Sequence, residues 1–211
     1  MNNYRSIITG DIVNSTRIQS QEALISILNN TIRLINDKFP LRSDIFRGDS
    51  FQIELKNISQ AMLTAVLIRA GLKSQTPENE KNLWDARISI GIGELSYDSD
   101  NISTSTGEAY ILSGHGLDNI GKDRLVLHTR WKEIDEEFEV STAFADNIIS
   151  SWSKKQSEVM FENLLNDSTQ TDIARKLQSS NQNIGKLERA AKENLIRLYL
   201  DRFEKIISEK I

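Results

Sequence analysis

The order of extended and helical patterns in the first 95 residues restricts the fold more than any other feature. Residues 5–13 have the β-rich composition of a strand, and residues 21–39 carry apolar side chains at helical spacing. Two short extended segments, 43–46 and 51–55, flank a Gly48-Asp49 turn, as in a hairpin. A helical pattern over 58–72 and alternating isoleucines over 87–95 complete the order β α β β α β. This order predicts an α+β ferredoxin-like or palm-type sheet, in which the first and third strands are neighbours.

Such a sheet would bring two acidic residues together. The end of the first strand lies beside the turn between the second and third, so Asp11 and Asp49 become neighbours although they are far apart in sequence. Two adjacent carboxylates repel each other unless a hard cation such as Mg²⁺ or Mn²⁺ lies between them. A Gly-Asp pair is also a common turn sequence, and spacing alone favours that simpler interpretation.

The rest of the chain divides at about residue 140. A Gly-interrupted helix is predicted over 107–120, a further strand over 124–129 and an acidic connector over 131–140, whereas only helical patterns follow. There are 15 basic and 20 acidic residues up to position 140, against 11 basic and 10 acidic residues after it. We therefore expect two domains, a sheet domain over 1–140 and a helical domain over 141–211.

Composition excludes several classes of site. The chain has no Cys and two His, which excludes disulfides, Cys-based zinc sites and histidine clusters. Any metal ion would be held by oxygen. No signal-peptide pattern and no run of about 18 apolar residues is present, so a cytoplasmic protein without a membrane partner is expected.

The segment 168–192 has the pattern helix, short turn, helix. A polar opening over 168–172 suits a helix N-terminus, and Ile173, Ala174, Leu177, Ile184 and Leu187 would pack between the two helices. Five basic and two acidic residues give this segment a local positive charge. Four residues of the second helix are candidates for DNA contacts, because amides read base edges and cations hold phosphates: Gln182, Asn183, Lys186 and Arg189. The alternative is a helical interaction module with a solvated polar face.

The final stretch, 193–211, carries an apolar stripe. It either packs on its own domain or pairs two subunits. A homodimer would suit a DNA-binding helix pair, because such proteins often bind two half-sites.

The motifs ITGDIVNST (8–16), FRGDSF (46–51) and ISIGIGE (88–94) resemble those of class III nucleotidyl cyclases. Together with Gly107-Glu108-Ala109-Tyr110, the set resembles the SatD-like family, in which a cyclase-related domain is followed by a helix-turn-helix. The resemblance implies Asp11, Asp49 and the backbone carbonyl of Ile12 as metal ligands. It also implies Mg²⁺ or Mn²⁺ as cofactor, and a nucleotide and DNA as partners.

The sequence departs from the cyclase pattern at the residues that perform the chemistry. The positions of the cyclase Asn and Arg that stabilise the transition state are Ile111 and His115, and the position of the purine-selecting Lys is Ile45. Isoleucine cannot donate a hydrogen bond to a base or neutralise a phosphorane. Arg47 and His115 are the candidate replacements for binding a ligand, and no catalytic residue is assigned.

Three hypotheses follow. The first is a cytoplasmic DNA-binding transcription regulator whose catalytically degenerate cyclase-like domain senses a nucleotide or a metal ion. The second is a metal-dependent nucleotidyl cyclase or nucleotide phosphohydrolase. The third is a non-catalytic protein-interaction module.

Overall fold

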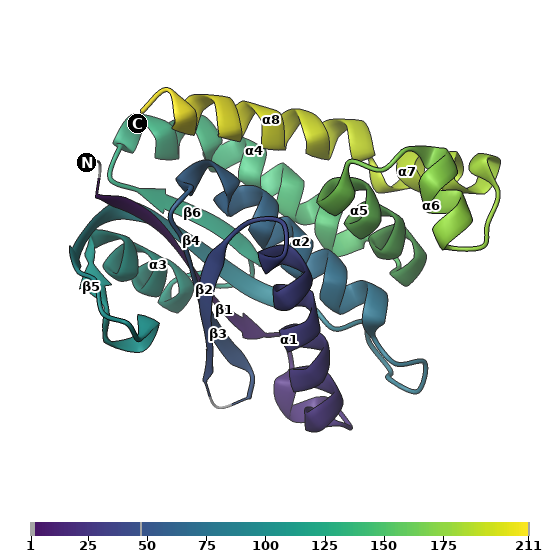
Figure 1. The fold of residues 1–211 in the computed structure, drawn as a ribbon, viewed down its shortest axis with the longest axis horizontal. Helices are drawn as coiled ribbons and strands as arrows, with labels where there is room; N and C mark the ends of the chain where they lie inside the picture. Colours follow the sequence, from purple (N-terminus) through teal and green to yellow (C-terminus); the bar gives the residue numbers. More distant parts are fainter. Residues whose placement is uncertain (1–2, 47, 211) are drawn as a thin grey trace.

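The computed structural model describes residues 3–46 and 48–210 (Figure 1). Its sheet has the order β2-β3-β1-β4-β5, and β6 also pairs with β4. β6 runs parallel to β4, whereas the other neighbouring strands are antiparallel. The predicted neighbours, the first and third strands, do pair with each other. The strands are β1 (Tyr4–Ile12), β2 (Leu41–Phe46), β3 (Ser50–Leu55), β4 (Ala86–Tyr97), β5 (Thr106–Gly107) and β6 (Leu125–Thr129).

Helices cover both faces of the sheet. The apolar side chains on one face of β1 and β4, such as Ile8 and Ile90, belong to a core shared with α1, α2, α4, α5 and α8. The opposite face carries α3, whose Ser113 hydroxyl lies 2.9 Å from the Thr9 hydroxyl of β1. The helices are α1 (Gln21–Asn36), α2 (Ala61–Gln75), α3 (Glu108–Asp118), α4 (Lys132–Ser151), α5 (Lys154–Asn166), α6 (Gln170–Lys176), α7 (Asn181–Ala191) and α8 (Glu193–Ser208). Short 3-10 turns are η1 (Ser15–Arg17), η2 (Ile58–Gln60) and η3 (Ile102–Thr104).

The segment expected to be a connector, 131–140, is instead the start of the 20-residue helix α4. Ile134 and Phe138 are buried and begin an apolar stripe with a period of a helix. The five acidic residues of 131–140 obscure this stripe in the sequence, because they surround two apolar positions that are only one helical turn apart. Position 140 therefore lies inside α4, and side chains from both sides of it share one core. The division into two domains stays a prediction.

A buried ion network fastens α4 to the sheet and to α2. The Arg69 guanidinium donates to Asp85 (2.8 Å from Nε to Oδ1) and to Asp146 (2.6 Å from Nη1 to Oδ1). Arg124 donates to the other oxygen of Asp85 at 2.7 Å, and Lys73 lies 3.5 Å from it. Burial alone would raise the pKa of Asp85, but the charge and hydrogen bonds of Arg69 outweigh it and lower that pKa to about 2.

Helices α6 and α7 extend from one end of the molecule (Figure 1). They rest on α5, whose Val159 joins Ile173, Ala174 and Ile184 in a small separate core, with Leu177 and Leu187 packed against it. Three of the five residues predicted to pack between these helices are therefore in that core, and the other two are packed against it. None of the described helices combines the length and the apolar character that a membrane-spanning segment requires.

Candidate functional site

The backbone brings Asp11 and Asp49 to the same place. β1 and β3 are antiparallel with Asp11 opposite Ser50, and the Ile12 N–H donates to the Asp49 carbonyl at 2.8 Å. Gly48, with a φ of +81°, supports the tight turn that precedes Asp49. The proximity predicted from the strand order is therefore present. We call this region, with Asp11, Ser15, Asp49, Ser50 and Arg87, the sheet-edge site.

The Asp49 carboxylate is held by hydroxyl groups. Ser15, just beyond the end of β1, donates to Oδ2 at 2.7 Å, and Ser50 donates more weakly to Oδ1 at 3.4 Å. Within the described residues, no Lys, Arg or His forms a salt bridge with Asp49.

The Asp11 carboxylate has a different partner, Arg87 of β4. These residues are directly opposite in the β1–β4 pair. Arg87 Nε donates to Oδ1 at 2.8 Å and Nη2 donates to Oδ2 at 2.5 Å, which is a bidentate ion pair. The hydrogen bond with Asp11 raises the pKa of Arg87.

This arrangement does not fit a divalent cation between the two carboxylates. Both oxygens of Asp11 are already bound by a guanidinium, which supplies the positive charge that a cation would provide. Among the described residues, no group of three or more His, Asp or Glu side chains is placed to hold a metal ion. The Mg²⁺ or Mn²⁺ cofactor and the ligand role of the Ile12 carbonyl stay predictions, and both require Arg87 to move away.

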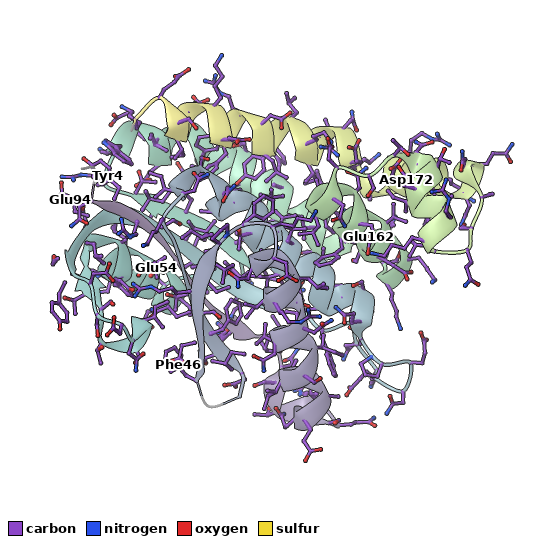
Figure 2. All side chains as sticks on the ribbon, in the orientation of Figure 1. Tyr4, Phe46, Glu54, Glu94, Glu162 and Asp172 are labelled. Atoms are coloured by element: carbon purple, nitrogen blue, oxygen red, sulfur yellow. The ribbon has the colours of Figure 1, made fainter. Side chains whose placement is uncertain are left out.

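The face of the sheet around the sheet-edge site is polar. Gln52 donates to Thr9 at 3.3 Å, and Glu54 accepts from Arg42 at 2.6 Å and from the Tyr110 hydroxyl at 2.7 Å. Burial, followed by the hydrogen bond to Glu54, raises the pKa of Tyr110. In Figure 2, the labelled Glu54 lies within the sheet and Phe46 lies near the hairpin end. Sequence reasoning missed this face, although polar residues at alternate positions of β1 and β3 signal it.

Of the two remaining predicted ligand-binding residues, the structure describes only His115. Arg47 lies outside the described residues. His115 is exposed on α3, and its side chain has no hydrogen bond or ion pair with Asp11 or Asp49. The neighbouring Gly116 allows α3 to approach the sheet, since a Cβ there would lie 2.2 Å from Ser89 Oγ. Ile111 is 59% exposed, so the position of the cyclase Asn presents an apolar side chain to solvent.

The four predicted DNA-contact residues share the exposed surface of α7. Gln182, Lys186 and Arg189 are at positions i, i+4 and i+7, which lie on one side of a helix. Neither Lys186 nor Arg189 forms an ion pair within the described residues. Asn183 is also exposed and donates to Ser179 Oγ at 2.9 Å. We call Gln182, Asn183, Lys186 and Arg189 the α7 face.

Hydrogen bonds hold α7 against its neighbours from the inner side. The buried carboxylate of Glu188 accepts from Asn163 of α5 at 3.1 Å and from Gln170 of α6 at 2.6 Å. Ser180 caps the start of α7 by accepting from the Asn183 N–H. Between α6 and α7, Gln178 adopts a left-handed conformation with a φ of +50°. The α7 face thus belongs to a helix that is held in place by two neighbouring helices, α5 and α6.

Comparison with known proteins gives only distant similarities. No protein-family model matches the chain, and no curated protein matches its sequence. The chain is similar to the active GGEEF domain of a diguanylate cyclase from Vibrio cholerae, with a TM-score of 0.43 and 17% identity over 61% of this chain and 84% of that one. It is also similar to a bacterial light-regulated adenylyl cyclase, with a TM-score of 0.42 and 14% identity over 59% of this chain and 74% of that one. Similarities of this size carry no conclusion about function.

Proposed function

We propose that this protein is a DNA-binding regulator that reads DNA with the α7 face and binds a nucleotide at the sheet-edge site without converting it. The observation that carries the DNA-binding part is the pair of unpaired cations on an exposed helix whose inner side is packed. Elsewhere many cations have acidic partners, such as Lys176 with Glu162 and Arg202 with Glu137. Lys and Arg side chains without an acidic partner are free to bind the phosphates of DNA.

The helix dimensions support insertion into a groove. α7 has 11 residues, and its N-terminal turn carries Gln182 and Asn183, the amide side chains that can pair with base edges. Lys186 and Arg189 follow along the same surface and suit backbone phosphates. This division of roles is that of a recognition helix, in which phosphate contacts position the protein and base contacts give specificity.

The DNA-binding proposal is tested by fluorescence anisotropy with labelled 30-base-pair duplexes of mixed sequence at low salt. Arg189→Ala should weaken binding by about tenfold, because one phosphate contact to a charged group contributes on the order of 1 to 2 kcal/mol. Lys155→Ala is the matched control, since Lys155 is exposed on α5 and pairs with Glu158. Equal affinity of Arg189→Ala and the wild-type protein, or no binding by either, contradicts the proposal.

The absence of turnover rests on the chemistry of two positions. Ile111 and Ile45, at the places of the cyclase Asn and purine-selecting Lys, have no polar atoms in their side chains. They cannot stabilise a developing charge or read a base edge. The metal-dependent enzyme remains the second hypothesis. It predicts a cyclic or hydrolysed product when the protein is incubated with each nucleoside triphosphate and Mn²⁺, whereas our proposal predicts unchanged nucleotide.

Nucleotide binding itself is tested by thermal unfolding. A ligand that binds only the folded state raises the melting temperature, by an amount that grows with ligand concentration. We expect one of the four nucleoside triphosphates at millimolar concentration to raise it, and we expect Arg87→Gln, which removes the guanidinium of the sheet-edge site, to remove that rise. Arg202→Gln on α8 is the control, because Arg202 pairs with Glu137 and is not part of that site. No rise with any nucleotide contradicts this part of the proposal.

We also propose that two copies associate through α4 and α8. Phe144 (68% exposed) and Leu198 (67% exposed) border an apolar groove of about 460 Å³ between these helices. A two-fold contact would pair apolar groove with apolar groove, and the Glu137–Arg202 pair at the rim adds no net charge. Light scattering should report a dimer that Leu198→Asp dissociates and that Leu83→Asp, on a distant surface, leaves intact. A monomeric wild-type protein contradicts the dimer.

A further inference from the structure

Arg87 has donors to spare at the sheet-edge site. A guanidinium carries five N–H groups, and Asp11 uses one on Nε and one on Nη2. Within the described residues, Arg87 has no other hydrogen-bond acceptor for its side chain. Its side chain is 41% exposed, so the remaining three N–H groups can reach a ligand. Asp11 therefore fixes the orientation of a guanidinium that still has unused hydrogen-bond donors.

The position of Arg87 is set by the backbone. Asp11 and Arg87 are directly opposite each other on neighbouring antiparallel strands, and the Ile12 residue that follows is bonded to Asp49 on the other side of β1. The strand register thus places one guanidinium, two carboxylates and the Ser15 hydroxyl at one edge of the sheet. Arginine is well suited to phosphate there, because its planar fork matches two phosphate oxygens.

We propose that Arg87 takes the place of a divalent cation at Asp11, so that the sheet-edge site binds the phosphate of its ligand through a guanidinium and without a metal ion. Asp11 is then a positioning residue for Arg87. The inference rests on the nucleotide binding proposed above, but the exclusion of metal ions by Arg87 can be measured by itself.

The competition between Arg87 and a cation predicts a gain of function. A divalent cation would have to compete with Arg87 at Asp11, because both carboxylate oxygens already accept from the guanidinium and its positive charge repels a second cation. Removing the guanidinium leaves Asp11 unpaired beside Asp49. Arg87→Ala should therefore gain a site for Mn²⁺, and so should Arg87→Gln, which keeps a longer, uncharged side chain.

Mn²⁺ binding is measured by electron paramagnetic resonance or calorimetry with Mn²⁺ alone. We expect no Asp11-dependent Mn²⁺ binding in the wild-type protein, which means that Asp11→Asn alone should not change its Mn²⁺ affinity. The same is expected of the control Arg202→Ala, which breaks a guanidinium–carboxylate pair between α8 and α4. Arg87→Ala should bind one Mn²⁺ ion at least tenfold more tightly than any Mn²⁺ is bound by the wild-type protein, and the double variant Arg87→Ala with Asp11→Asn should lose this ion. Circular dichroism verifies that each variant is folded, and Arg87→Gln replaces Arg87→Ala if the latter is not. Asp11-dependent binding by the wild-type protein, or no gain in either Arg87 variant, overturns the inference.

A second measurement uses ATP, GTP, CTP and UTP in the presence of EDTA. The wild-type protein should bind at least one of them without a metal ion, and Arg87→Gln should weaken that binding at least tenfold. Binding that requires Mn²⁺ overturns the metal-free site. If no nucleotide binds under any condition, the proposed nucleotide function fails, while the Mn²⁺ measurement still decides whether Arg87 excludes the cation.

Discussion

Gly91 shows how closely individual residues control the polar face of the sheet. A Cβ at this position of β4 would lie 2.2 Å from the Ala109 carbonyl oxygen and 2.5 Å from the Ser113 nitrogen, both in the backbone of α3. Neither atom can move without shifting the helix. The glycines of the ISIGIGE motif therefore let α3 lie directly on the sheet, a role that the sequence alone did not reveal.

Gly91→Ala should destabilise the protein by about 3 kcal/mol, as overpacking against backbone does. Gly114→Ala is the matched control: Gly114 is also in this region, on α3, but a Cβ there meets nothing within 4 Å. The control should stabilise the protein by up to about 1 kcal/mol, because alanine is the better helix former. Urea unfolding measures both changes. Similar stabilities of the two variants would show that α3 is not held as closely as described.

The acidic pair illustrates what a sequence predicts and what it leaves open. The order of elements was enough to predict that Asp11 and Asp49 are close, because it fixes which strands are neighbours. The partner of Asp11 could not be predicted, because it depends on the exact β1–β4 register that sets Arg87 opposite it. Arg47 and His115 follow only from similarity to motifs. Arg47 lies outside the described residues, and the His115 side chain forms no hydrogen bond or ion pair with Asp11 or Asp49.

The sequence predicts α6 and α7 of the C-terminal part correctly but does not predict the start of α4. The small core between α6 and α7 was predicted because its apolar residues recur at helical spacing between capping residues. The start of α4 was missed because acidic side chains dominate its composition, and only tertiary packing on the sheet reveals the buried side. The turn between α6 and α7 has Gln178 where a glycine is usual, and it still adopts the left-handed conformation.

Gln178→Gly should stabilise the protein by up to about 1 kcal/mol. The left-handed backbone conformation costs a residue with a Cβ about 1 to 2 kcal/mol, and glycine avoids this cost. The greater flexibility of glycine in the unfolded chain offsets part of the resulting gain in stability. Gln178→Ala removes the same side chain but keeps a Cβ, so it should give no gain. Urea unfolding of the three proteins measures the difference. A destabilised Gln178→Gly variant would contradict the turn conformation.

Across the molecule, the sheet-edge site and the α7 face are well separated. In Figure 2 the labelled Phe46, near the hairpin end, lies in the lower left part of the view, whereas Asp172 on α6 lies at the upper right. The elements between them are tied by the shared core and by the buried ion network, which joins α2 and α4 to the residues just before β4 and β6, Asp85 and Arg124. A signal from nucleotide to DNA would have to pass through these packed elements. None of the network was predicted, since its charges are scattered over 77 positions of the sequence.

The ion network predicts a specific dependence of stability on pH. The folded-state pKa of Asp85 is about 2, below its value in an unfolded chain. Its contribution is therefore complete above the unfolded pKa and is lost as the pH falls toward 2. Asp85→Asn should cost about 3 to 5 kcal/mol at pH 7, because it leaves Arg69 buried without its main partner. The difference from the wild-type protein should shrink between pH 4 and pH 2, roughly the interval between the two pKa values.

The control for this prediction is Asp167→Asn. Asp167 is exposed and pairs with Arg197 at 3.2 Å, so its loss should cost less than about 1 kcal/mol at every pH. Chemical unfolding at pH 7, 4 and 3 gives the comparison. An effect of Asp85→Asn that does not change with pH would contradict the network.

The salt dependence of DNA affinity tests the central claim most directly. If the α7 face binds DNA, the logarithm of the association constant should fall linearly with the logarithm of salt concentration. Lys186→Ala and Arg189→Ala should each reduce the magnitude of that slope by about one, because each removes one phosphate contact. A slope near zero, or the same slope in the wild-type protein and both variants, would mean that these side chains do not contact DNA.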